Sequence, residues 1–149
     1  MRKGNSDVSK FYITTDGYFT NRSDIKKKRI VAVLEQRKSD GAVAVVKVYS
    51  KEGKEQKIGK TFIPGLTLQP HDHPSLSKES IVGRQVVFGR KSRNTIRAIY
   101  PDDFNDTTDS LSKKELKIIR KAVHNDTKQH RASYKHKKKR WKKHFNTNE

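Results

Sequence analysis

The sequence contains no cysteine among its 149 residues and no long apolar run. The lack of cysteine excludes disulfides, zinc–thiolate sites and thiol catalysis. No stretch of about 18 apolar residues is present to span a bilayer, and the first residues lead into no apolar segment of the kind that a secretory signal needs. A glycine-rich phosphate loop, a nucleophile elbow and a zinc motif are also missing. We therefore expect a cytoplasmic protein that uses no membrane, no metal and no cofactor.

Acidic residues are scarce, with 16 Asp and Glu against 35 Lys and Arg and a formal net charge of +19. Such a field attracts polyanions, so nucleic acid is the expected partner. The length suits one domain, and the apolar residues lie in short runs that can still build a core. Residues 128–149 hold nine Lys and Arg and one acid. We expect a domain over residues 1–127, followed by a basic tail.

The tail interleaves aromatic residues with its cations. Tyr134, Lys138, Trp141 and Phe145 fall on one face of a helix. In one interpretation the tail is a cationic helix, or an arm that folds on RNA, whose rings stack on bases or pack against the body. In the other it is a solvated tail that only raises the charge. Under the first interpretation the residues that contact RNA are Arg131, Tyr134, Lys138, Arg140 and Trp141.

Strand signals dominate the sequence before the tail. Short runs of β-branched and aromatic residues alternate with turn residues every 8 to 12 positions. The predicted strands are residues 10–15, 30–34, 42–49, 61–63, 66–68, 80–82, 85–88 and 95–100. Short strands at this spacing predict a mainly β fold, in the form of a small, partly closed barrel.

One helix is predicted over residues 111–124. Ser112 lies three residues before Glu115, as in a capping box that begins a helix. Leu116, Ile119 and Val123 then form a narrow apolar stripe that can face the barrel. The acid-rich stretch just before this helix lacks the pattern of a calcium loop and favours the helix N-terminus.

The two central strands form a hairpin with an arginine and a serine at its open end. If the turn centres between Ser39 and Asp40, Arg29 lies opposite Ser50, and a shifted turn makes them diagonal neighbours. We expect both side chains on one face, about 5 to 8 Å apart. An arginine fork and a hydroxyl suit a phosphodiester, although both residues also fit as polar strand ends in water. The lysines expected to contact RNA around them are Lys26, Lys27, Lys28, Lys51 and Lys54.

Two histidines, His71 and His73, flank Asp72 between prolines. On an extended segment their rings point to one face, which suits general acid–base chemistry near RNA or part of a metal site. No third ligand at suitable spacing is present, and the prolines favour a plain exposed loop. If the loop folds over the end of the hairpin, either histidine could supply the general acid.

The order of these features resembles the MazF/PemK family of toxin endoribonucleases. The segments "KFYITTDG", "KKKRIVAVLEQ" and "AVAVVKVYSK" are similar to the early strand, the arginine-bearing strand and the strand with a terminal hydroxyl. "LSKESIVGRQVVF" and "SLSKKELKIIRKAV" resemble the family's late segment and closing helix, so the similarity covers roughly residues 8–124. Ile30 stands where the family usually has proline and Ser50 where threonine is common. The loop before Arg29 is rich in lysine rather than glycine.

The resemblance implies an SH3-like barrel, usually dimeric, with a packed C-terminal helix. It leaves the basic tail, expected from its spacing to be a helical extension, unaccounted for. It implies metal-independent cleavage of single-stranded RNA to a 2′,3′-cyclic phosphate and a 5′-hydroxyl, as in an mRNA interferase held in check by an acidic antitoxin protein. Arg29 would be the catalytic arginine and Ser50 the catalytic hydroxyl. The alternative is a non-catalytic nucleic-acid-binding accessory protein on the same barrel, serving plasmid maintenance, conjugation or the ribosome.

Overall fold

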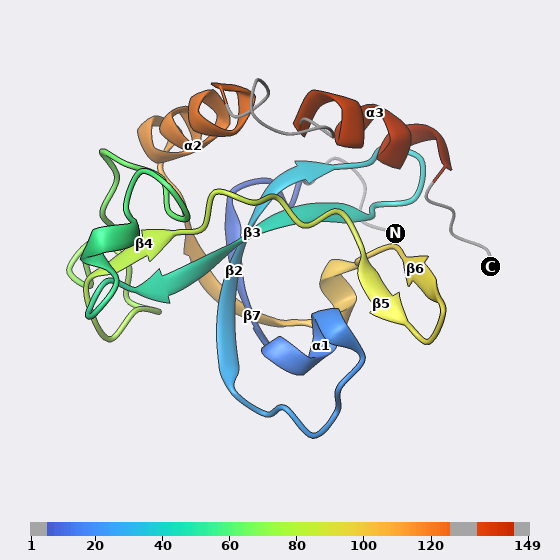
Figure 1. Ribbon diagram of the computed structural model, residues 1–149, viewed down its shortest axis with the longest axis horizontal. Coiled ribbons are helices and arrows are strands. Elements are labelled where there is room, and N and C mark those ends of the chain that lie inside the picture. The colour runs from blue at the N-terminus through green and yellow to red at the C-terminus, as the bar shows by residue number, and fades with distance from the viewer. Residues whose placement is uncertain (1–5, 126–133, 145–149) are drawn as a thin grey trace.

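The computed structural model describes residues 6–125 and 134–144, and the protein is mainly β (Figure 1). No helix within these two ranges is long and apolar enough to cross a bilayer. Two 3-10 helices, Glu55–Lys57 and Pro101–Asp103, lie in connections. In chain order the strands and α-helices are β1 (Lys10–Thr15), α1 (Asp16–Thr20), β2 (Lys28–Gln36), β3 (Val43–Ser50), β4 (Ser80–Val82), β5 (Arg90–Ser92), β6 (Thr95–Arg97), β7 (Asn105–Ser110), α2 (Lys113–Asn125) and α3 (Tyr134–His144).

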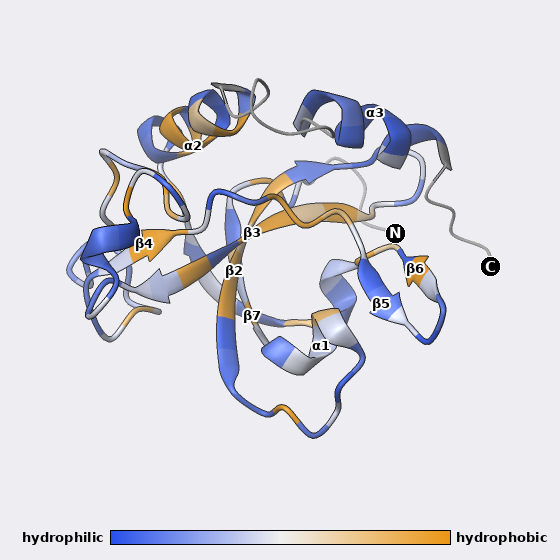
Figure 2. Cartoon of the chain, viewed as in Figure 1, coloured by the Kyte–Doolittle hydropathy of each residue, from blue (hydrophilic) through white to orange (hydrophobic). Residues whose placement is uncertain are grey.

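Five antiparallel strands form the main sheet in the order β4-β3-β2-β1-β7, and β5 pairs with β6 in a separate hairpin. The central strands β2 and β3 contain unbroken apolar runs over residues 30–34 and 43–46, because both faces of the sheet are covered there. One face packs with α2 and α3, and the other packs with Phe19 of α1, Ile99 and Phe104. Figures 1 and 2 show these apolar central strands between the two helices on one side and α1 with the β5–β6 hairpin on the other.

The predicted helix over residues 111–124 is confirmed as α2, with its capping box. The Ser112 amide donates to Glu115 Oε1 at 2.8 Å, and the Glu115 amide donates to Ser112 Oγ at 3.1 Å. Ile119 and Val123 are fully buried on the predicted apolar face. The stripe therefore fixes the helix on the sheet as its spacing predicts.

The tail contains a helix, α3, that packs on the same core as the sheet. Tyr134 and Trp141 are buried, and both rings contact Phe88. The predicted helical face is therefore a packing face, and the described part of the tail is not a solvated extension. Arg131 and Phe145 lie outside the described residues.

Several predicted strands are shorter than expected, and two strands and one helix were not predicted. Residues 61–63, 66–68 and 85–88 contribute isolated bridges through Phe62, Leu68 and Val87 instead of strands. The short helix α1 and the strands β5 and β7 had no apolar pattern to reveal them. Strand β7 is polar throughout, and its place at the sheet edge comes from pairing with β1.

The register of the central hairpin differs from the predicted one because β2 contains a bulge at Leu34. Next to the turn, Gln36 faces Val43, which is the predicted pairing. Past the bulge, Ile30 faces Val48, so the register is shifted by one residue. A shift of one residue moves side chains to the opposite face of a sheet.

The prediction that Arg29 and Ser50 share a face is therefore wrong. The shifted register places Tyr49 beside Arg29, and the guanidinium lies over the Tyr49 ring, 4.1 Å from its centroid. Arg120 of α2 donates from Nη2 to the Leu34 carbonyl oxygen at 2.8 Å, which satisfies the carbonyl of the bulged residue.

Candidate nucleic-acid interface

A cavity of about 290 Å³ lies at the open end of the β2–β3 hairpin, and we call it the hairpin cavity. Arg29 and Ser50 both contribute to its lining although their side chains lie on different faces of the sheet. The lysines in the lining are Lys27, Lys28, Lys54 and Lys78. The serines are Ser50, Ser75, Ser77 and Ser80. No Asp or Glu occurs among the described residues of this lining, so its charge is wholly positive.

Most of these lysines form no ion pair. Lys27, Lys28 and Lys54 have no carboxylate at ion-pair distance among the described residues, and Lys27 and Lys54 interact with Asp16 and Glu52, respectively, only at longer range. Lys78 contacts the exposed Glu52 at 3.0 Å. Three ammonium groups around a hydroxyl-rich hollow make an anion-attracting surface. Such groups remain available to phosphate oxygens.

The two other lysines predicted near the hairpin end lie beside this cavity. Lys51 approaches Glu79 at 4.0 Å and is absent from the lining. Lys26 lines a neighbouring cavity of about 580 Å³, which Lys28 also lines. The predicted basic cluster is therefore divided between two hollows that meet at Lys28.

Arg29 is anchored by a carboxylate that the sequence argument missed. Its Nε and Nη2 donate to the two carboxylate oxygens of Asp16 at 2.8 and 2.9 Å, and Nη1 donates to the Val48 carbonyl at 3.1 Å. The side chain lies over Tyr49 and the residue is 9% exposed. The hydrogen bonds from Arg29 hold the pKa of Asp16 below its usual value, and the same contact raises the pKa of Arg29. The fork predicted to grip a phosphate is thus occupied by Asp16 in this conformation.

The position of Asp16 depends on the glycine that follows it. A Cβ on Gly17 would lie 2.0 Å from the carbonyl oxygen of Arg22 and 2.7 Å from that of Ile25. Glycine therefore lets the chain after α1 fold back against the start of the helix. This close approach of the backbone lets Asp16 and Arg29, which are 13 residues apart in the sequence, form their ion pair.

Ser50 has a different environment from Arg29. It ends β3 opposite Ser80 of β4, and its Oγ is shielded from solvent with no hydrogen-bond partner among the described groups. A shielded hydroxyl without a partner is costly, and a bound ligand oxygen would remove that cost. Ser80 and Ser75 differ, because their hydroxyls donate to the Lys78 carbonyl and to Asp109.

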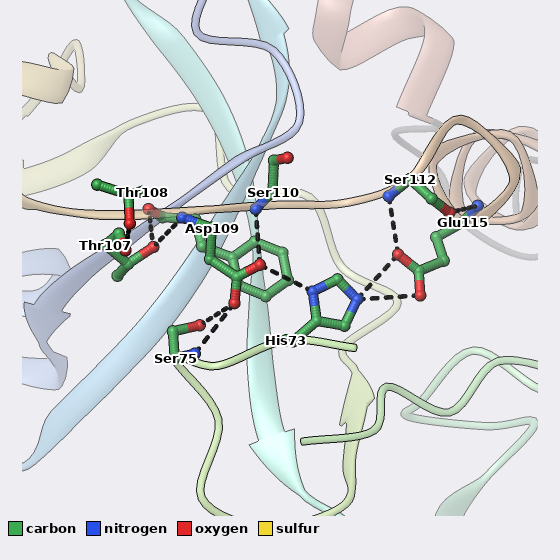
Figure 3. A network of polar contacts seen from close by, with 9 residues as sticks. His73, Ser75, Thr107, Thr108, Asp109, Ser110, Ser112 and Glu115 are labelled. Atoms are coloured by element: carbon green, nitrogen blue, oxygen red, sulfur yellow. Dashed lines mark hydrogen bonds and ion pairs between the residues drawn. The ribbon is translucent and has the colours of Figure 1, made fainter. Parts of the chain in front are cut away.

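His73 lies in a closed network of polar groups, shown in Figure 3. Its Nδ1 is 3.0 Å from Asp109 Oδ1, its Nε2 is 3.0 Å from both carboxylate oxygens of Glu115, and its ring stacks on Phe11. Burial opposes the charged form, but the hydrogen bonds to Glu115 and Asp109 outweigh it and raise the pKa of His73. The carboxylate at each ring nitrogen therefore favours the imidazolium form of His73.

The carboxylates of this network have further donors. Asp109 Oδ2 accepts from the Ser75 hydroxyl at 2.6 Å and from the Ser75 amide at 3.1 Å. Burial opposes its ionisation, yet the hydrogen bonds from Ser75 and His73 lower the pKa of Asp109. We call His73, Asp109, Glu115 and Ser75 the histidine network. The network connects three parts of the chain: β7, α2 and the loop that contains His73 and Ser75. Through Ser75 this loop also lines the hairpin cavity.

The two histidines do not share a face as predicted. A turn in which the amides of Asp72 and His73 both donate to the Gln69 carbonyl buries His73, at 3% exposed, and leaves the side chain of His71 76% exposed beside Asp72. Both His73 nitrogens are occupied, so this ring does not face a ligand as an acid. Among the described residues no group of three His, Asp or Glu is arranged to hold a metal ion.

The aromatic residues of α3 contact protein rather than solvent. The Tyr134 hydroxyl donates to Glu35, Lys138 Nζ lies 3.1 Å from the same carboxylate, and the Trp141 carbonyl accepts from Arg37 Nη1 at 2.6 Å. Stacking of these two rings on RNA gains no support from this arrangement. The exposed cations of the helix include Arg140.

The described residues thus place a wholly cationic hollow beside a closed histidine network, with Ser75 common to both. The chain matches no protein-family model, no curated protein and no solved structure.

Proposed function

We propose that this protein binds single-stranded RNA and seats a backbone phosphate in the hairpin cavity. The observation that carries the proposal is the lining of that cavity, which contains four lysines and no described carboxylate. Lysines that neutralise phosphates release condensed counterions, and this release supplies most of the sequence-independent affinity for nucleic acid. The net charge of +19 would steer the polyanion toward the surface.

Each group in the cavity has a distinct part in this proposal. Lys28 and Lys54 would donate to non-bridging phosphate oxygens, because neither forms an ion pair with a described carboxylate. The unpartnered Ser50 hydroxyl would add a neutral donor. The net charge of the Arg29–Asp16 pair is close to zero, so the pair would attract phosphate only weakly. Its part would be to hold the wall of the cavity in place through its two hydrogen bonds.

Cleavage of the RNA is a second candidate function, favoured by the presence of Arg29 and Ser50 in one cavity. In this reaction the substrate's 2′-hydroxyl attacks phosphorus and loses its proton, while the 5′-oxygen leaves and gains one. The products are a 2′,3′-cyclic phosphate and a 5′-hydroxyl. Arg29 would stabilise the charge on the phosphorane and share in proton transfer, and Ser50 would orient the phosphate. Arg29 would first have to share its donors between Asp16 and the substrate.

Incubation with single-stranded RNA in EDTA separates the two candidates. We expect the wild-type protein to bind, and the Lys28→Glu, Lys54→Glu double variant to bind at least 10-fold more weakly. If the protein also cleaves, the products carry a cyclic phosphate, and Arg29→Ala and Ser50→Ala abolish cleavage while Lys117→Glu does not. If clean wild-type protein binds RNA without cleaving it, only the RNA-binding role is retained. If it does not bind RNA at all, both the binding and the cleavage proposals are wrong.

The finer features implied by the family resemblance are also proposals. An SH3-like barrel is supported by the bridges Val45–Val87 and Phe62–Gly83, which extend pairing beyond the main ladders. An acidic antitoxin would bind over the lysines of the hairpin cavity and compete with RNA. A homodimer would appear in sedimentation as twice the 17.2 kDa chain mass. A cytoplasmic location would suit an RNA substrate of this kind.

A further inference from the structure

The outer edge of the main sheet is covered by another segment of the chain along β4, but it is open over the residues that follow β4. β4 pairs with β3, and the segment over residues 61–68 covers the other side of β4. The Ile63 amide donates to the Val82 carbonyl at 2.9 Å, and the Arg84 amide donates to the Thr61 carbonyl at 2.9 Å. The cover ends at this last contact.

The next residues, 85–89, continue the edge. Val87 bridges Val45 of β3 through two hydrogen bonds of 3.0 and 2.7 Å, so both of its backbone groups point into the sheet. In an antiparallel pair the backbone groups of the flanking residues, Val86 and Phe88, then point outward. They pair with no backbone group of the described chain. Their side chains are buried, which holds this edge in a fixed position.

A cavity of about 380 Å³ lies along this edge, between residues 85–89, β6 and α3. Ile96 of β6 lines it and is 51% exposed, the one large hydrophobic side chain that is exposed among the described residues. Lys137 and Arg140 of α3 line the same cavity, and no described acid does. Proteins usually cover or blunt such edges, because an open edge is a template for another strand.

We propose that this edge and its cavity bind an acidic, extended peptide segment by strand addition. The peptide backbone would pair with Val86 and Phe88, an apolar side chain would cover Ile96, and carboxylates would meet Lys137 and Arg140. The apolar wall and the row of backbone groups match a peptide better than a phosphate chain. The inference does not depend on RNA binding at the hairpin cavity.

The test uses a fluorescent eight-residue peptide of alternating Glu and Val, with a second peptide of the same sequence in which every backbone amide is N-methylated. The two have the same charge, but the second has no backbone N–H donor on either edge and cannot pair with a sheet edge. Anisotropy titration should show binding of the first peptide and at least 10-fold weaker binding of the second. The Lys137→Glu, Arg140→Glu double variant should bind the first peptide at least 10-fold more weakly than wild type. The matched control on α2, the Lys117→Glu, Lys121→Glu double variant, should change the affinity for this peptide less than threefold.

Each other outcome overturns the proposal. Equal binding of the two peptides, or equal loss in both double variants, would mean attraction by net charge alone. The Lys28→Glu, Lys54→Glu variant has a disabled hairpin cavity. If oligouridine still displaces the peptide from this variant, the edge would be assigned to RNA. A wild-type dimer that becomes a monomer in the Lys137→Glu, Arg140→Glu variant would assign it to a second copy of the chain. Hydrogen exchange should slow at residues 86 and 88 on peptide binding, and slowing confined to other segments would contradict the assignment.

Discussion

The hairpin cavity and the histidine network both contain residues predicted to be catalytic, and they treat their polar groups in opposite ways. In the histidine network the ring nitrogens of His73 and the carboxylates of Asp109 and Glu115 are all hydrogen-bonded. In the hairpin cavity three lysines form no ion pair with a described acidic residue, and the Ser50 hydroxyl has no hydrogen-bond partner among the described groups. The first arrangement stabilises the fold, whereas the second leaves groups that a ligand can complete.

We expect the largest loss of stability from His73→Ala. Removing the ring leaves the carboxylates of Asp109 and Glu115, whose side chains are 7% and 17% exposed, without their cation. Breaking a shielded ion pair of this kind typically costs about 3–5 kcal/mol of unfolding free energy. Chemical denaturation monitored by circular dichroism measures the change. His71→Ala is the matched control and should lie within about 0.5 kcal/mol of wild type, because this side chain is exposed. Equal effects of the two substitutions would remove the distinction between the histidines.

Arg29→Ala and Ser50→Ala should differ sharply in stability. Arg29→Ala removes hydrogen bonds to a carboxylate, for which a loss of about 1.5–3 kcal/mol is expected. Ser50→Ala removes a hydroxyl without a partner, so the unfolding free energy should stay the same or rise slightly. The same denaturation experiment decides between them. A large loss for Ser50→Ala would show that its hydroxyl is engaged in the folded protein.

The lysines of the hairpin cavity should affect RNA binding and leave stability nearly unchanged. Each phosphate contact to a single strand contributes roughly 0.7 to the slope of log K against log salt. Lys28→Glu with Lys54→Glu should therefore lower that slope by roughly one unit or more. Fluorescence titration with oligouridine over a series of salt concentrations measures it, with Lys117→Glu and Lys121→Glu as the control. An unchanged slope would place the RNA elsewhere.

The smallest expected effect is a gradual dependence of stability on pH from the histidine network. The folded pKa of His73 is raised, so its contribution is fully present below the unfolded value of about 6.5. It is lost as pH rises through the raised folded pKa, because the folded state then gives up a proton that had stabilised it. Unfolding free energies of wild type and His73→Gln should converge as pH rises over this window. Curves that run parallel would contradict this linkage.

Much of the fold follows from local patterns in the sequence. The strands β1 to β4 follow from runs of β-branched and apolar residues, and α2 follows from its capping box and apolar stripe. The polar strand β7 could not be predicted this way, because its position depends on pairing with β1 rather than on its own side chains. The spacing of Tyr134 and Trp141 indicated a helix face, but it could not show that the face is buried.

The candidate site was harder to predict because it depends on contacts between distant residues. The bulge at Leu34 shifts the hairpin by one residue, and no glycine or proline in β2 signals it. Asp16, the partner of Arg29, belongs to the short helix α1 rather than to the hairpin. His73 meets Asp109 and Glu115 only after the chain has folded. The lysine clusters, in contrast, are visible directly in the sequence.

Lysine acylation footprinting of the full chain, with and without single-stranded RNA, tests the assignment of the hairpin cavity most directly. Mass spectrometry reads the reactivity of each amine. The account predicts that Lys27, Lys28 and Lys54 react readily in the free protein and are protected by RNA, while Lys117 and Lys121 on α2 are unchanged. Protection of the α2 lysines with no protection at the cavity would contradict it.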